Sequence, residues 1–292
     1  MQNALGDFSN FFYVISFLGH PAFWFLVAAV LYWNSREKES FWLINLVVFT
    51  SVVIGALKGA FARPRPSAAE FRVFGEPAFV SKLGDAGMSF PSGHAGIIAA
   101  ITKFFYGPIL QIKKINIFWI GIFLILLVGL SRLVLGLHFL SDVLAGIAIG
   151  GLMGFAAWQT HLRLEKKGFK LSQMDDELGF LLTMVLAIFL MVAIAPPLLA
   201  AVVLGYYAGF FGANETGFVQ SKVSGNKRIA KSILGLIGTG VLAFWGLNHP
   251  IFMEQFIVFF AIGFWVTAAW PWLFERVFLQ SKKPLKTVSK HK

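Results

Sequence analysis

The sequence predicts an all-α, polytopic helical membrane protein, on the basis of its composition and its hydropathy pattern. Apolar residues make up 57% of the chain and charged residues only 13%, and the mean hydropathy is +0.73. Apolar runs close to the roughly 20 residues that a helix needs to cross a bilayer recur along the whole chain. A soluble domain does not fit between these runs, so we expect one helical membrane unit.

Residues 1–160 are expected to form a core of about five to six helices. In chain order, the core is predicted to contain a short amphipathic or half-inserted segment at about 8–18 and spans at about 21–33, 41–62, 92–111, 116–131 and 142–159. The loop from 63 to 91 is polar and contains Pro and Gly, so it is expected to lie outside the hydrocarbon region.

The charged connector at 161–177, HLRLEKKGFKLSQMDDE, is the clearest internal boundary of the chain. Beyond it, residues 178–276 contain four apolar runs, which predict about four further transmembrane helices of unknown role. Residues 277–292 form a basic tail. The whole chain is therefore expected to cross the membrane about nine times.

The distribution of basic residues predicts the orientation of the chain. With nine crossings, most Lys and Arg residues fall on one side together with the connector and the tail, and positive loops favour the cytoplasm. The loop at 63–91 and the turn at 132–141 then face the periplasm or exterior of an inner or plasma membrane. Membrane lipids are expected partners of the basic tail, and nucleic acid is not.

Three short stretches place polar side chains on that predicted outer face. In the first stretch, Lys58 lies in the last turn of the span at 41–62. Arg65 follows between Pro64 and Pro66, which disfavour a continued helix. Two cations are therefore expected to converge at one surface of the membrane.

The second stretch is SFPSGHAG, which contains Ser92, Gly93 and His94. Ser92 can cap the helix that follows, and Gly93 lets a ligand approach the backbone. The free N–H groups of this helix N-terminus form a natural site for an anion.

The third stretch is SRLVLGLHFLSD, at 131–142. Arg132 lies where one span ends, His138 follows in the turn, and Asp142 lies four residues later in the first turn of the next helix. At that spacing the carboxylate can reach the imidazole.

Together these side chains suit phosphoryl transfer with neither metal nor cofactor. Three cations, a hydroxyl and a helix N-terminus can neutralise the oxygens of a phosphoryl group. His138 suits a neutral nucleophile whose tautomer is held by Asp142, while His94 suits an acid that later acts as a base. Two histidines in opposite protonation states predict a bell-shaped pH profile. Cysteine is absent, which excludes disulfides and cysteine metal sites.

The three stretches resemble the signatures of the type 2 phosphatidic acid phosphatase family: Lys58-x6-Arg65-Pro66, Pro91-Ser92-Gly93-His94 and Ser131-Arg132-x5-His138-x3-Asp142. Members of this family are integral membrane, metal-independent phosphatases. The resemblance implies that His138 forms a phosphohistidine, that Asp142 is its partner and that His94 is the acid and base. It also implies a phosphate cradle formed by Lys58, Arg65, Ser92, Gly93 and Arg132.

The expected function is hydrolysis of a phosphate monoester or diphosphate on a lipid. Transfer of the phosphoryl group to an acceptor hydroxyl uses the same intermediate and remains an alternative. A transporter or a non-catalytic scaffold is the alternative of another class, although no acidic relay runs through the predicted spans. Oxidation of halide by bound vanadate would use the same cradle but does not suit a membrane setting.

Two further stretches carry structural hypotheses. The loop at 67–88 is a candidate lid over a lipid headgroup, since it contains Phe71, Phe74, Phe79 and Lys82. Small residues recur at four-residue spacing in AGIAIGGLMG, so one helix face is expected to approach a neighbour closely at Gly146, Gly150 and Gly154.

Overall fold

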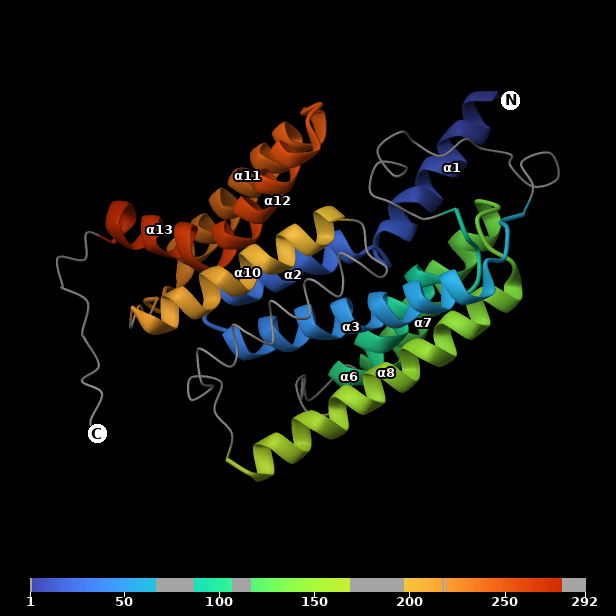
Figure 1. The fold of residues 1–292 in the computed structure, drawn as a ribbon, viewed down its shortest axis with the longest axis horizontal. Coiled ribbons are helices and arrows are strands. Elements are labelled where there is room, and N and C mark those ends of the chain that lie inside the picture. Colours follow the sequence, from blue (N-terminus) through green and yellow to red (C-terminus); the bar gives the residue numbers. More distant parts are fainter. Residues whose placement is uncertain are drawn as a thin grey trace. The chain divides into compact units, whose positions relative to one another are not determined.

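A computed structural model describes residues 2–66, 87–106, 117–168, 197–216, 218 and 220–279. Its regular elements are helical (Figure 1). In the N-terminal half they are α1 (Gln2–Phe17), α2 (Pro21–Trp33), α3 (Glu37–Phe61), α6 (Gly93–Tyr106), α7 (Ile117–Val134) and α8 (Leu140–Lys166). In the C-terminal half they are α10 (Pro197–Glu215), α11 (Gly225–Asn248), α12 (Phe252–Phe264), the π-helix η2 (Trp265–Ala269) and α13 (Trp270–Phe278). The all-α prediction is confirmed.

The chain divides into two compact units. The first unit contains Met1–Phe25 and Trp42–Phe169, and the second contains Leu26–Phe41 and Lys170–Lys292. The second half of α2 and the first turn of α3 therefore group with the C-terminal helices.

A glycine face joins α6 to α8 in the first unit, as the small-residue spacing predicts. Each of three glycines on α8 lies against a backbone carbonyl of α6 or of the residue just before it, so that an added methyl group would overlap that carbonyl. The pairs are Gly146 with Ser92, Gly150 with Gly96 and Gly154 with Ala100. This contact places the first turn of α8 beside the first turn of α6, which are the two turns that carry Asp142 and His94.

The apolar core of the first unit lies among α1, α6, α7 and the turn before α8. It is formed by Phe12, Ile15, Ile98, Ala99, Ile125, Val128, Leu135 and Leu137. The α1–α2 pair bends by 52°, and Trp24 Nε1 donates across the break to the carbonyl of Leu18 at 2.7 Å. The segment expected at 8–18 is thus the second half of α1, which is anchored in this core.

Buried hydrogen bonds tie the second unit together. Ser40 Oγ lies 2.8 Å from the hydroxyl of Tyr206, and Lys231 Nζ donates to Gln220 Oε1 at 2.8 Å. Lys231 is fully buried on α11. Its ammonium group therefore depends on protein atoms in place of water.

Four helices of the described residues are long and apolar enough to cross a membrane. They are Glu37–Phe61, Leu140–Lys166, Gly225–Asn248 and the continuous Phe252–Phe278. The bent pair of α1 and α2 makes a fifth if it counts as one span. Helices α6, α7 and α10 are apolar too, but their apolar parts are shorter.

The sequence predicts about nine crossings, about four of them C-terminal. The described residues contain fewer helices of membrane length than that. Two C-terminal helices have membrane length, namely α11 and the helix from α12 to α13. The apolar part of α10, Leu198–Ala213, is only about 24 Å long, whereas a hydrocarbon core is about 30 Å thick. The span expected at 178–195 lies outside the described residues, as do most of the candidate lid and the tail from residue 280.

Candidate active site

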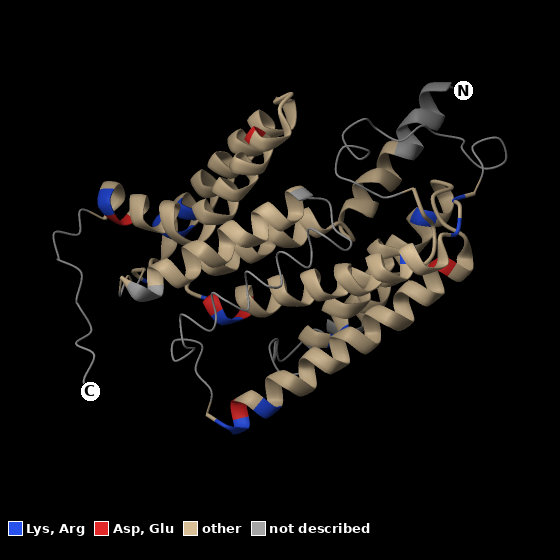
Figure 2. Ribbon diagram, in the orientation of Figure 1, with Lys and Arg blue, Asp and Glu red and all other residues tan. Residues whose placement is uncertain are grey.

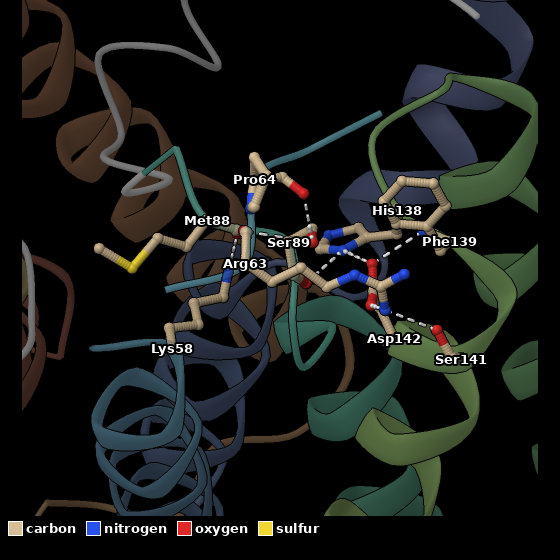
Figure 3. Close-up of polar contacts among 9 residues, drawn as sticks. All are labelled: Lys58, Arg63, Pro64, Met88, Ser89, His138, Phe139, Ser141 and Asp142. Atoms are coloured by element: carbon tan, nitrogen blue, oxygen red, sulfur yellow. Dashed lines mark hydrogen bonds and ion pairs between the residues drawn. The ribbon is translucent and has the colours of Figure 1, made fainter. Parts of the chain in front are cut away.

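The three motifs meet in the first unit at the start of α8, where the structure brings the loop after α3 beside the segment before α6 (Figure 3). Pro64 and Met88 form an isolated antiparallel bridge, and the Ser89 N–H donates to the carbonyl of Arg63 at 2.8 Å. Ser89 Oγ also donates to the carbonyl of Pro64 at 2.9 Å. This pairing sets the first motif against the second.

The two cations of the first motif lie on either side of the end of α3. Lys58 is in the last turn of the helix, as predicted, and is 8% exposed. Its Nζ donates to the carbonyl of Met88 at 2.9 Å. Arg65 follows the bridge at Pro64, and its side chain is partly buried.

Ser92 immediately precedes α6 and is fully buried. Its backbone N–H donates to the carbonyl of Asp142 at 2.9 Å, which joins the second motif to the third. The Ser92 hydroxyl makes no hydrogen bond to any other atom of the described residues, so the predicted helix cap does not form through this oxygen. A buried hydroxyl beside a helix N-terminus, and next to Gly93, is suited to bind an oxygen of a ligand.

Arg132 lies in the last turn of α7 and is 1% exposed. Its Nη1 donates to Ser16 Oγ of α1 at 2.6 Å. A buried guanidinium has lost its hydration, so its orientation is set by the protein atoms around it. The first helix of the chain thus contributes a partner to the third motif.

His138 has a nearer partner than the one that the motif spacing predicts. Its Nδ1 lies 2.7 Å from the carbonyl oxygen of Ser89 and 3.7 Å from Asp142 Oδ2. A carbonyl oxygen can only accept a hydrogen bond, so Nδ1 is the donor. In the neutral ring the lone pair is then on Nε2, which is the form that a nucleophile needs.

Asp142 is completely buried, and its carboxylate contacts Arg63 and Phe139 (Figure 3). Its Oδ2 accepts from the Phe139 N–H at 2.8 Å, and its Oδ1 accepts from Arg63 Nη1 at 2.8 Å. The carboxylate therefore caps the N-terminus of α8, where negative charge is favoured. Together with the bond from Ser92 to its carbonyl, these contacts make Asp142 the junction of the three motifs.

The motif comparison missed Arg63 and Ser89. Arg63 Nη1 also donates to Ser141 Oγ at 2.7 Å, and the guanidinium of Arg63 lies 4.2 Å from the centre of the Phe139 ring. The doublet of Arg63-Pro64 and Arg65-Pro66 was the available signal for the arginine. Ser89 acts on His138 through its backbone carbonyl, which residue type does not reveal.

His94 lies in the first turn of α6 and is partly buried. A methyl group added to Gly19 would lie only 2.7 Å from its Cβ, and the centre of the His20 ring lies 5.5 Å from that of His94. Both neighbours come from the break between α1 and α2. Among the described residues, no three His, Asp or Glu side chains gather closely enough to hold a metal ion.

Comparison with known proteins identifies the family. Residues 39–166 match the PAP2 superfamily, and residues 197–283 match the family described as PAP2 superfamily phosphatase, transmembrane extension. The first match contains all three motifs. No solved structure matches the chain significantly.

Several curated proteins are similar to part of the chain. Lipid A 1-phosphatase of Rhizobium etli is 35% identical over 111 residues, which are 38% of this chain and 45% of the relative. Phosphatidylglycerophosphatase B of Bacillus subtilis is 35% identical over 85 residues, which are 27% of this chain and 42% of the relative. Undecaprenyl-diphosphatase of Sulfolobus acidocaldarius is 27% identical over 160 residues, which are 54% of this chain and 72% of the relative.

The chain covers less than half the length of the first two of these relatives. The resemblance that the three motifs predict is nevertheless confirmed by the family matches. The chain is a multi-pass integral membrane protein of the PAP2 superfamily and carries that superfamily's transmembrane extension at residues 197–283.

Proposed function

We propose that this protein is a metal-independent phosphatase that hydrolyses a lipid phosphate monoester or diphosphate through a phosphohistidine at His138. The supporting observation is the 2.7 Å contact between His138 Nδ1 and the carbonyl of Ser89. Because Nδ1 must donate in that contact, Nε2 carries the lone pair that attacks phosphorus.

The reaction proceeds in two steps. In the first, a bond forms between His138 Nε2 and phosphorus, the bond from phosphorus to the leaving oxygen breaks, and His94 gives its proton to that oxygen. In the second, a water molecule attacks phosphorus, His94 takes the proton of the water, and the bond to His138 breaks to release phosphate. His94 therefore ends each cycle protonated, as it began.

The phosphate cradle provides the electrostatic part of catalysis. The charge of the transferred group is spread over its three equatorial oxygens, and preorganised donors stabilise that charge. We assign this role to Lys58, Arg65, Ser92, Gly93 and Arg132. Asp142 does not contact the phosphoryl group in this proposal; it positions Arg63 and the start of α8.

A lipid is the proposed substrate because the site lies at one end of the membrane-length helix α8. A headgroup can reach the site there while its apolar chains stay among the helices. The relatives named lipid A 1-phosphatase, phosphatidylglycerophosphatase B and undecaprenyl-diphosphatase support this substrate class.

The orientation is proposed from the charges of α8. The 27 residues of α8 extend about 40 Å, and charged groups lie at both of its ends (Figure 2). The end opposite the site carries Arg163 and Lys166 in its last turn, followed by Lys167. Since basic residues favour the cytoplasmic side, we place the site on the periplasmic or exterior face of an inner or plasma membrane.

The proposed domains follow from this assignment. Residues 1–160 form the catalytic core and residues 178–276 the membrane extension, while the connector at 161–177 and the tail at 277–292 lie in the cytoplasm. In the structure, helix α8 continues through the start of this connector as far as Lys166.

The test is phosphate release by the purified protein in detergent with EDTA, from phosphatidic acid, phosphatidylglycerol phosphate, a prenyl diphosphate and lipid A. We expect release from at least one lipid by the wild type and by the control variant His249→Ala, and none by His138→Ala. His249 lies between α11 and α12 in the second unit, so it controls for loss of a histidine.

A phosphoenzyme assay separates the alternatives. In one outcome, an acid-labile phosphoprotein forms and releases no phosphate, but passes its phosphoryl group to a lipid that carries a hydroxyl group. That outcome would show that the protein is a phosphotransferase and not a hydrolase. If neither phosphate nor a phosphoprotein appears with any substrate, the chain is not a phosphatase, and a transporter or scaffold role would take its place.

A further inference from the structure

The break between α1 and α2 reaches the active site although it belongs to none of the three motifs. The chain makes a tight turn there, in which the N–H groups of Leu18, Gly19 and His20 donate to carbonyls three residues earlier. The same end of α1 supplies Ser16 Oγ, which accepts from Arg132 Nη1 at 2.6 Å. The turn is thus held against the site at a point independent of His94.

Gly19 brings the turn into backbone contact with His94. A methyl group at Gly19 would lie 2.7 Å from the Cβ of His94 and 2.8 Å from its carbonyl oxygen. Distances this short cannot be relieved by rotating a side chain, since the neighbouring atoms are backbone or Cβ. The close approach leaves the next residue, His20, beside the His94 ring.

The imidazole of His20 is held in one orientation and one tautomer. Its Nδ1 accepts from the N–H of Ala22 at 3.1 Å, and its ring stacks on Phe17 with centroids 5.7 Å apart and an interplanar angle of 14°. A protonated Nδ1 would direct a hydrogen at the Ala22 N–H, so this contact favours the neutral ring with its hydrogen on Nε2.

The two histidine rings are in direct contact. Their centroids lie 5.5 Å apart with an interplanar angle of 57°, which is within the range of paired aromatic rings. Two imidazolium ions at this separation would repel each other. A neutral His20 therefore permits His94 to be the ring that carries the catalytic proton.

We propose that His20 is a positioning residue for His94. The His20 ring orients the His94 ring by direct contact and, because it is neutral, allows His94 to hold the catalytic proton. The inference rests on the proposed role of His94 as acid and base. It adds the α1–α2 break to the active site as a fourth part, alongside the three motifs.

The charge at position 20 is the variable that tests this inference. Among the residues that the structure describes, the other charged or titratable groups around the site are His138 just before α8, Asp142 in the first turn of α8, Arg132 on α7, and Lys58, Arg63 and Arg65 from α3 and the segment after it. These groups are the same in every His20 variant. A pH shift that follows the sign of the charge at position 20 therefore reports on the contact between the two rings.

The experiment measures kcat/KM against pH for His20→Glu, His20→Gln and His20→Lys. The first step needs protonated His94, so His94 sets the alkaline limb of the profile. We expect that limb to move up in His20→Glu and down in His20→Lys, by roughly half to one pH unit. His20→Gln should keep the wild-type limb while kcat falls about tenfold. The same charges placed by His249→Glu and His249→Lys should move neither limb.

A titration that does not need turnover separates this inference from the proposed function. The imidazole resonances of His94, assigned through His94→Gln, are followed against pH by NMR in the wild type, His20→Glu and His20→Lys. Opposite displacements of the His94 midpoint support the inference, whether or not the wild type releases phosphate. Superimposable His94 titrations overturn it, even if His138→Ala shows that the protein is a phosphatase.

Discussion

The Nδ1 atom of His138 lies 2.7 Å from the carbonyl oxygen of Ser89 and 3.7 Å from Asp142 Oδ2. The backbone, and not the carboxylate, therefore makes the shorter contact that selects the tautomer. The motif spacing predicts that Asp142 holds the imidazole, whereas the structure gives the shorter contact to Ser89. Ser89 holds the imidazole ring of His138, while Asp142 binds Arg63 and caps the start of α8, the helix on which Asp142 lies.

We expect Asp142→Asn to lower kcat about 10- to 100-fold, far less than His138→Ala. The amide keeps the shape of the carboxylate but loses its charged hydrogen bond to Arg63, which is typically worth about 1.5–3 kcal/mol. The Ser89 carbonyl still selects the tautomer of His138. Steady-state kinetics on the best substrate checks this, and a loss as complete as that of His138→Ala would show that the carboxylate itself holds the imidazole.

Substitution of Arg63 should reduce kcat about tenfold and leave KM nearly unchanged. Arg63 contacts Asp142 and Ser141, and its side chain is 38% exposed, so its removal disturbs the position of Asp142 more than the binding of phosphate. Arg63→Lys should recover only part of the rate, because an ammonium does not reproduce the guanidinium fork. A rise in KM of the same size would place Arg63 in the phosphate cradle.

The glycine face of α8 should be required for the geometry of the site. In Gly146→Ala the new methyl group would overlap the carbonyl of Ser92, which overpacks the contact by about 1–3 kcal/mol and displaces the second motif. Gly151→Ala is the matched control on the same helix, because a methyl group there meets nothing within 4 Å. The transition temperature of thermal unfolding in detergent and the rate of phosphate release should both be lower for Gly146→Ala. Both should change little for Gly151→Ala.

The profile of kcat/KM against pH should be bell-shaped. Below the acid limb His138 is protonated and has no lone pair on Nε2, while above the alkaline limb His94 has lost the proton that the leaving oxygen needs. His94→Gln should be slow and should lack the alkaline limb, while the acid limb remains. A profile for His94→Gln that keeps both limbs would assign the acid to another group.

Lys231 should stabilise the second unit. In Lys231→Ala the buried oxygen Gln220 Oε1 loses its 2.8 Å hydrogen bond from Nζ, and an unsatisfied buried acceptor costs about 1–3 kcal/mol. Lys227 is exposed on the same helix, so Lys227→Ala is the matched control. Thermal unfolding in detergent should show a lower transition temperature for Lys231→Ala only, and equal values would mean that the Lys231 bond contributes no net stability.

The sequence by itself was enough to predict the helical class, the three motifs and the close contact along Gly146, Gly150 and Gly154. Hydropathy and four-residue spacing are local properties of a helix, and they do not depend on what packs against it. The number of crossings was harder to predict, because a short apolar run such as Leu198–Ala213 has the composition of a span without the length.

Only the tertiary structure showed which atoms meet. It showed that the backbone carbonyl of Ser89 selects the tautomer of His138. Every residue type has such a carbonyl, so the sequence could not reveal this contact. It also brought Arg63 to Asp142, across 79 positions of the chain, and His20 to His94. Motif spacing fixes which side chains can share one helix turn, whereas contacts between helices depend on how their faces pack.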